Sequence, residues 1–134
     1  MQTYRVQRAI VVSAMLLGTA LFVPAAMLDG TKWKVKVVPD KATADKGGKP
    51  FTDELIFANG QFTSRAMLRN GFKTSKYKSE TEPGEIGFEV EQFRATNDVA
   101  IWIADTRGTN MIGGLQWKRK VNGDFIYEVT GTKE

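Results

Sequence analysis

The dipeptide Asn-Gly occurs three times in this 134-residue chain, at Asn59-Gly60, Asn70-Gly71 and Asn122-Gly123. Each pair lies between segments rich in β-branched and aromatic residues. Both central residues of a type I′ turn need a positive φ, which Asn tolerates and Gly adopts freely, and the twist of this turn matches the strands that it joins. The three pairs therefore predict antiparallel β-hairpins and an all-β fold.

These Asn-Gly pairs and other turn-forming segments divide the chain after residue 30 into eight candidate strands. They are Thr31–Val38, Asp53–Ala58, Gln61–Arg69, Phe72–Ser79, Ile86–Ala95, Val99–Asp105, Asn110–Lys120 and Asp124–Thr132. Short strands at regular spacing, joined mostly by tight turns, predict a meander, and no segment shows the periodicity of a helix.

Apolar and polar side chains alternate along these strands. In the first strand Trp33, Val35 and Val37 share one face, and three lysines share the other. This pattern is typical of a sheet with one face in a core and the other in water. Eight antiparallel strands would leave two open edges unless the sheet closed. We therefore expect an eight-stranded up-and-down meander barrel.

Two strands depart from simple alternation. The segment Val99–Ala104 is apolar on both faces, so we expect its outer face to be covered by a loop, a partner subunit or the long segment Pro39–Thr52. In the seventh strand, the pair Gly113-Gly114 predicts a bulge or sharp coil that helps a small barrel to close.

The first 26 residues are typical of an export signal. Arg5 and Arg8 form a basic region, Ala9–Phe22 an apolar region, and Val23–Ala26 supplies small residues for cleavage. The alternative is an uncleaved membrane anchor. If the signal is cleaved, residues 27–134 form one domain that is periplasmic or secreted, with no stable membrane insertion.

The opening Leu28-Asp29-Gly30-Thr31-Lys32-Trp33, with Trp at the start of the first of eight strands, resembles the calycin-type barrels. These include lipocalins, fatty-acid-binding proteins, avidins and small bacterial lipocalin-like domains. Two residues separate Gly30 from Trp33, whereas lipocalins and avidins have Gly-x-Trp. Bacterial domains with a Leu-x-Gly-Thr-x-Trp opening fit better. The resemblance implies the architecture and assigns no ligand residue.

Composition argues against an enzyme. The chain has no His and no Cys, so it lacks the commonest general base, the commonest transition-metal ligand and the thiol nucleophile. Glu89 and Glu91 share a strand face, but alternation places that face in water. Asp105 is expected to begin a turn, and Gly47-Gly48-Lys49 lacks the spacing of a phosphate loop. We expect no catalytic residue, no metal and no cofactor.

Aromatic side chains indicate where a small molecule could bind. The residues predicted to contact a ligand are Trp33, Ser64, Phe88, Trp102, Trp117 and Tyr127. Ser64 is an inward polar candidate, and Gln92 and Arg119 are two more near strand ends. An eight-stranded barrel is just wide enough either to fill itself or to hold one small molecule, and both alternatives remain open.

Two functional hypotheses follow. The first is an exported, non-enzymatic barrel that binds a small apolar or amphipathic ligand in its interior or mouth. The second is a periplasmic protein-interaction or inhibitor module with a packed barrel, in which the long loop, the hairpins and the outer face of Val99–Ile103 contact an envelope protein. The sequence assigns neither the ligand nor the oligomeric state.

Lysines alternate with other residues in Lys32–Lys36 and in Phe72–Lys78. These stretches are interpreted first as solvated faces, and second as sites for an acidic polysaccharide, an anionic lipid headgroup or an acidic protein. Nucleic acid is not expected, because Trp33 and the lysines beside it point to opposite faces and cannot form one stacking platform. The net charge of +4 also falls to about +2 when Arg5 and Arg8 leave with the signal.

Overall fold

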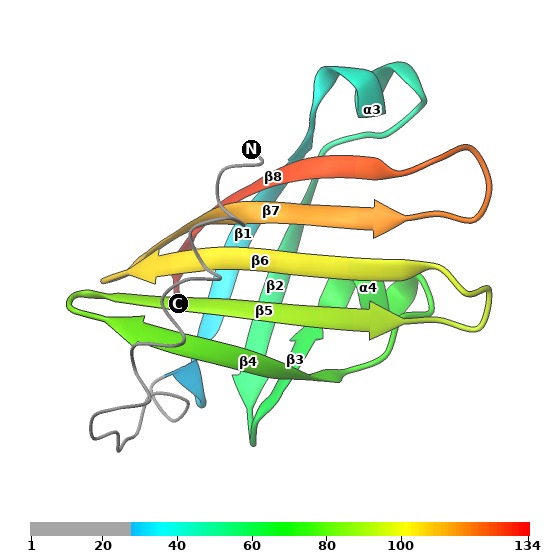
Figure 1. Cartoon of the computed structure of the whole chain (residues 1–134). Helices are drawn as coiled ribbons and strands as arrows, with labels where there is room; N and C mark the ends of the chain where they lie inside the picture. The colour runs from blue at the N-terminus through cyan, green and yellow to red at the C-terminus, as the bar shows by residue number, and fades with distance from the viewer. Residues whose placement is uncertain (1–27) are drawn as a thin grey trace.

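A computed structural model describes residues 28–134, in which eight antiparallel strands form a closed up-and-down barrel (Figure 1). The strands are β1 (Lys32–Pro39), β2 (Phe51–Ala58), β3 (Gln61–Ser64), β4 (Ser75–Glu82), β5 (Glu85–Phe93), β6 (Val99–Arg107), β7 (Asn110–Lys118) and β8 (Phe125–Lys133). Each strand pairs with its neighbours in sequence, and β1 pairs with β8. The predicted fold class is confirmed. The predicted export signal lies outside the described residues.

One of the three Asn-Gly pairs forms the expected two-residue hairpin turn. Asn59 and Gly60 have φ values of 55° and 76° and join β2 to β3, with Phe57 opposite Phe62. Positive φ at both positions is what a type I′ turn requires. Asn122 and Gly123 also have positive φ values, 70° and 78°. Because β7 ends at Lys118 and β8 begins at Phe125, this pair lies in a longer connection, and the predicted two-residue turn is not formed there.

The prediction of a hairpin at Asn70-Gly71 was wrong. The predicted strand Gln61–Arg69 ends at Ser64 and continues as the short helix α4 (Arg65–Arg69), and β4 begins only at Ser75. Ser64 Oγ accepts a hydrogen bond from the backbone N–H of Met67 at 3.0 Å and so caps the start of the helix. Asn70 ends it, and Gly71 follows with a φ of 93°.

A second short helix, α3 (Lys41–Asp45), lies in the segment between β1 and β2. The Asp40 carboxylate caps it by accepting from the Thr43 N–H at 2.8 Å, and Thr43 Oγ1 accepts from the Ile126 N–H at 2.8 Å. Lys46 Nζ donates to the carbonyl of Asp124 at 2.7 Å. This segment therefore docks on the start of β8, and it is not the cover that was considered for the sixth strand.

The two ends of the barrel differ. The loop end carries both helices and the β5–β6 and β7–β8 connections, whereas the hairpin end carries the β2–β3, β4–β5 and β6–β7 turns. Residues 28–31 fold over the hairpin end. There Leu28 is buried, and Asp29 accepts hydrogen bonds from the Gly60 N–H and, at 2.5 Å, from the Tyr77 hydroxyl.

Glycine lets strands approach closely at two inner positions. A Cβ at Gly113 would lie 2.3 Å from the carbonyl oxygen of Ile103, and one at Gly131 would lie 2.3 Å from that of Lys34. Pairing of β7 with β6 is continuous from Asn110 to Lys118, so the predicted bulge at Gly113-Gly114 is not formed. Gly113 instead allows the tight coiling that closes the barrel.

Candidate functional site

Aromatic rings pack against one another in the middle of the barrel. The rings are Phe57, Phe62, Tyr77, Phe88 and Trp102, with centroids 4.9–5.8 Å apart in the contacting pairs. Phe57, Phe62 and Trp102 are 0% exposed. A void that could hold water would leave accessible surface on the side chains that line it, so no such void adjoins these three rings.

A second chain of rings lies nearer the loop end. It runs Phe51, Tyr127, Phe125, Trp117 and Phe72, with successive centroids 5.6–6.4 Å apart and mostly edge-to-face geometry. This is the arrangement that aromatic pairs prefer. The rings come from β2, β7, β8 and the residues after α4, so the chain ties together strands and loops that are distant in sequence.

Cationic side chains cover the second ring chain. The Arg94 guanidinium carbon lies 5.0 Å from the Phe72 centroid and 5.1 Å from that of Trp117. The guanidinium of Arg119 lies 4.0 Å from the ring of Phe125, and Lys46 Nζ lies 5.7 Å from the same ring. Such cation–π contacts are favourable, and here they place charge between the rings and the solvent.

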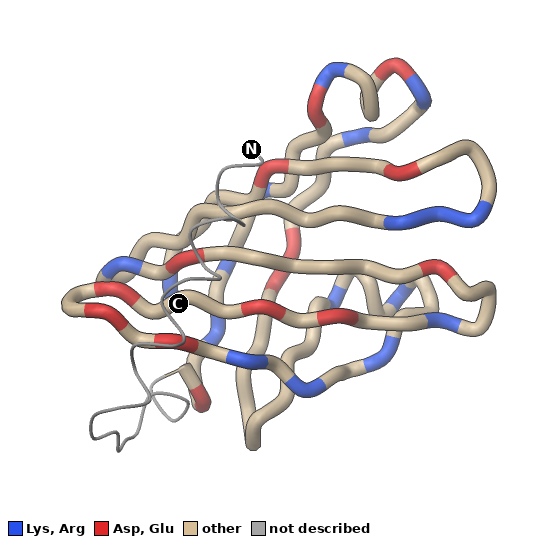
Figure 2. The backbone as a smooth tube through the Cα atoms, in the orientation of Figure 1, with Lys and Arg blue, Asp and Glu red and all other residues tan. Residues whose placement is uncertain are grey.

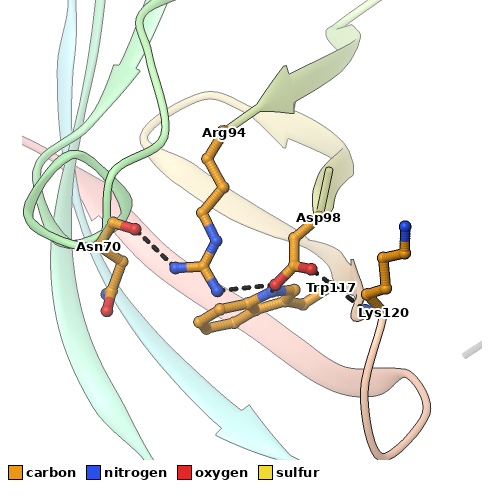
Figure 3. Close-up of polar contacts among 5 residues, drawn as sticks. All are labelled: Asn70, Arg94, Asp98, Trp117 and Lys120. Carbon is orange, nitrogen blue, oxygen red and sulfur yellow. Dashed lines mark hydrogen bonds and ion pairs between the residues drawn. The ribbon is translucent and has the colours of Figure 1, made fainter. Parts of the chain in front are cut away.

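A polar cluster around Asp98 joins the parts of the loop end (Figure 3). Asp98, 5% exposed, accepts hydrogen bonds from Arg94 Nη2 at 2.7 Å, from Trp117 Nε1 at 3.1 Å and from the Lys120 N–H at 3.1 Å. Arg94 Nη1 also donates to the carbonyl of Asn70 at 2.7 Å. The cluster therefore connects the end of α4 with the β5–β6 and β7–β8 connections.

The environment of Asp98 favours its charged form. Burial opposes ionisation, but the hydrogen bonds from Arg94, Trp117 and Lys120, together with the charge of Arg94, outweigh it. The pKa of this carboxyl therefore lies below its ordinary value. A carboxylate with this donor set holds the loops in place.

The predicted ligand residues are divided between different parts of the barrel. Phe88 and Trp102 belong to the central ring cluster, whereas Trp117 and Tyr127 belong to the chain of rings near the loop end. Trp33 is buried near the hairpin end, where its Nε1 donates to Thr31 Oγ1 at 2.9 Å. Their assignment to a ligand site stays a prediction.

The inward polar candidates have partners within the protein. Ser64 Oγ is hydrogen-bonded to Asp53 Oδ2 and accepts from Met67. Gln92 Oε1 accepts from Trp102 Nε1 at 2.8 Å, and its Nε2 donates to the carbonyl of Lys73 at 3.0 Å. These contacts position α4 and the segment that follows it.

Asp53 is the buried carboxylate that the sequence interpretation missed. Its Oδ1 accepts from the N–H groups of Glu54 and Ala66 at 2.7 and 2.9 Å, and its Oδ2 accepts from Ser64. Burial raises the pKa of this carboxyl, and the three donors partly oppose that shift. A buried carboxyl with a raised pKa occurs at many catalytic sites. Here, however, both carboxylate oxygens accept hydrogen bonds from residues at the start of α4, so a structural role accounts for the buried carboxyl. Its position could have been read from alternation with Leu55 and Phe57.

The outer face of β5, β6 and β7 carries apolar side chains, which we call the apolar face. Its members are Phe93, Val99, Ile101, Ile103 and Ile112. Phe93 and Ile112 are 55% and 48% exposed, and the three residues of β6 are half-buried.

Carboxylates border the apolar face. Glu91 lies opposite Ile101, and Glu89 lies opposite Ile103. On the other side Glu128 of β8 pairs with Gly114, the β7 neighbour of Ile103. Figure 2 shows acidic positions along β5. Lys118 of β7 lies opposite Val99. The face is therefore apolar at its centre and acidic along its two sides, with a lysine near the loop end.

Compared with known proteins, the chain matches no family model, no curated protein sequence and no solved structure. The structure defines an all-β protein with a closed eight-stranded up-and-down barrel, compatible with a lipocalin-like fold. Within residues 28–134, no three acidic, His or Cys side chains gather where they could hold a metal ion. That range also has no helix of the length and hydropathy needed to cross a membrane.

Proposed function

We propose that the protein is a non-enzymatic interaction module of the cell envelope, whose barrel presents the apolar face to a protein partner. The observation that carries this proposal is the outer surface of β6, where Val99, Ile101 and Ile103 occupy three successive outward positions beside exposed Phe93 and Ile112. Outward positions of an antiparallel sheet are normally polar when they face water. Contiguous apolar surface on a folded domain marks interaction sites.

The border of the apolar face indicates the chemistry of the partner. Glu89 and Glu91 on one side and Glu128 on the other place negative charge along the aliphatic side chains, and Lys118 lies opposite Val99. Complementary charge steers association and disfavours wrong partners. We therefore expect the partner to present apolar side chains bordered by Lys and Arg.

Packing in the barrel also supports this function. The central rings leave no water-sized space beside Phe57, Phe62 and Trp102, and the Asp98 cluster ties the loops together at one end. A barrel that is packed around these central rings is a rigid scaffold that fixes the geometry of its outer surface. Its export to the periplasm or medium is part of the proposal and rests on residues 1–26.

A lipocalin-like ligand carrier is the second candidate. Ser79 and Thr81 lie on the inner face of β4, since they pair with Phe88 and Ile86. Their hydroxyl oxygens are buried and have no hydrogen-bond partner among residues 28–134. Unpaired buried polar groups call for an explanation, and a polar ligand group near the hairpin end is one. Such a ligand would be small and amphipathic.

Site-specific photo-crosslinking in the native host tests the interaction proposal. A photoreactive residue replaces Ile112 on the apolar face or, as the control, exposed Gln61 on the outer face of β3. We expect one discrete protein adduct from position 112 and none from position 61. No adduct at position 112, or the same adducts from both positions, would contradict the proposal.

A further inference from the structure

A groove of about 910 Å³ lies on the outer surface of β1, β2 and β8, beside α4. Lys34 and Lys36 of β1 and Arg65 and Arg69 of α4 line it, together with threonine hydroxyls such as those of Thr52 and Thr130. Asp53, Glu54 and Glu134 also line it. Because Asp53 is buried, the exposed cations of the groove outnumber its exposed carboxylates. We call it the basic groove. None of its lining residues belongs to the apolar face.

Lys36 has no carboxylate beside it in the sheet. Its cross-strand neighbours are Thr52 on β2 and Thr130 on β8. Lys34 lies opposite Thr132 on one side and Glu54 on the other. Glu54 already forms an ion pair with Arg65 at 2.6 Å. Lys36 therefore has no directly facing carboxylate, and Lys34 shares Glu54 with Arg65.

The lysines of β4 provide a contrast. Lys78 lies directly opposite Glu89, and the next outward pair along the two strands is Lys76 and Glu91. Opposite charges on facing strands compensate one another. Positive potential is therefore greater around Lys36, which faces two threonines, than along β4, where lysines face glutamates.

The arginines of the basic groove stand on an element that is held firmly. Asp53 and Ser64 fix the first turn of α4, and Asn70 Nδ2 donates to the carbonyl of Ala66 at 3.0 Å. Arg65 and Arg69 are four residues apart, so they lie on one side of the helix. Arg69 is exposed and forms no salt bridge with the described residues, although its charge acts on the buried Asp53 carboxyl.

We propose that the basic groove binds an extended acidic segment of another protein. Alternate residues of a strand lie roughly 6.4–6.8 Å apart. Lys34 and Lys36 have this spacing, which an extended peptide with a carboxylate at every second residue reproduces. Arg69 meets a further carboxylate, and Thr52 and Thr130 donate hydrogen bonds. None of the described residues that line the groove is aromatic, so they offer no ring on which a sugar could stack, which favours a polypeptide over an acidic polysaccharide.

Fluorescence anisotropy with a labelled Glu-Thr repeat peptide of eight residues tests the proposal. The wild-type mature protein should bind it, and binding should weaken as salt is raised towards 0.5 M, because exposed charges are screened. The double variant Lys34→Glu/Lys36→Glu should lose about tenfold or more in affinity. The matched control Lys76→Glu/Lys78→Glu carries the same change in net charge and should lose less than about threefold.

Three results would overturn this inference. The first is no binding of the peptide at low salt, and the second is an equal loss in the two double variants, which would reflect net charge alone. The third is tighter binding of polygalacturonate than of the peptide at equal charge. The variant Ile103→Lys, on the apolar face, should bind the peptide as the wild type does. Failure of the basic groove is therefore distinguishable from failure of the proposed function.

Discussion

The guanidinium of Arg94 donates a 2.7 Å hydrogen bond to the Asp98 carboxylate and lies 5.0 Å and 5.1 Å from the ring centroids of Phe72 and Trp117. Trp117 donates to the same carboxylate, so one ring contacts both members of the ion pair. The side chains of Arg94 and Asp98 are 23% and 7% exposed. These contacts hold the connections at the loop end of the barrel together, and Asp98 accepts hydrogen bonds from three of the groups involved.

Replacing Asp98 with Asn should lower the free energy of unfolding by about 1–3 kcal/mol, because Arg94, Trp117 and the Lys120 N–H lose a charged acceptor. Urea denaturation measures this. The control is Asp45→Asn, which removes the exposed pair with Lys41 and should change stability by less than about 1 kcal/mol. Equal effects of the two substitutions would show that the Asp98 cluster is not a structural fastening.

The contribution of Asp98 to the free energy of unfolding should decrease as the pH falls. The folded state lowers the pKa of this carboxyl, so its contribution is present above the ordinary Asp value of about 4 and is lost as the pH falls through the folded value. The difference in stability between the wild type and Asp98→Asn should therefore shrink below pH 4. A difference that stays constant down to pH 2 would contradict this assignment.

Asp53 should show the opposite dependence. Burial raises the pKa of this carboxyl in the folded state. Its contribution to stability is therefore complete below the pKa of an unfolded Asp and is lost as the pH rises through the pKa of the folded state. Relative to the wild type, Asp53→Asn should become more stable as the pH is raised from 3 to 7. Unfolding curves at several pH values measure this difference, and a decrease over that range would refute the prediction.

Truncating Trp33 to Ala should cost roughly 3–5 kcal/mol, because its ring is 2% exposed on the inner face of β1. Phe93→Ala is the matched aromatic control on the outer face, and it should cost less than about 1 kcal/mol. Both values come from chemical denaturation of the mature protein. A near-neutral Trp33 variant would show that the inner face of β1 is assigned wrongly.

Adding one methyl group at Gly113 should destabilise the barrel by about 1–3 kcal/mol or more. The new Cβ would overlap the backbone of Ile103 and Ala104, which cannot move without parting β6 from β7. Thermal unfolding of Gly113→Ala measures the loss. An unchanged midpoint would mean that the two strands do not approach as closely as the structure has them.

Alternation along the strands predicted the inner and outer faces because a strand has a period of two residues and one face is buried. The Asn-Gly signal was less specific, since Asn and Gly also end helices, as they do at Asn70-Gly71. Both helices have only five residues, too few to show a period, although Asp40 and Ser64 are typical N-cap residues.

The contacts of the candidate site were harder to predict. Phe51 packs on Tyr127, and Gln92 holds both Trp102 and the backbone of Lys73. These contacts depend on which strands meet across the barrel and on the space left between their side chains. Hydrophobic alternation along the sequence predicts neither of these. Sequence reasoning therefore nominated buried aromatic residues correctly as inward without establishing whether they enclose a cavity or fill it.

Native mass spectrometry of the mature protein, purified from its own envelope, tests the central claim most directly. The interaction proposal predicts a complex with a second protein, which is lost in Ile103→Lys and kept in Gln61→Lys, and no small molecule released on denaturation. A reproducible small-molecule mass on the wild type, without any protein partner, would contradict the proposal and favour the ligand carrier.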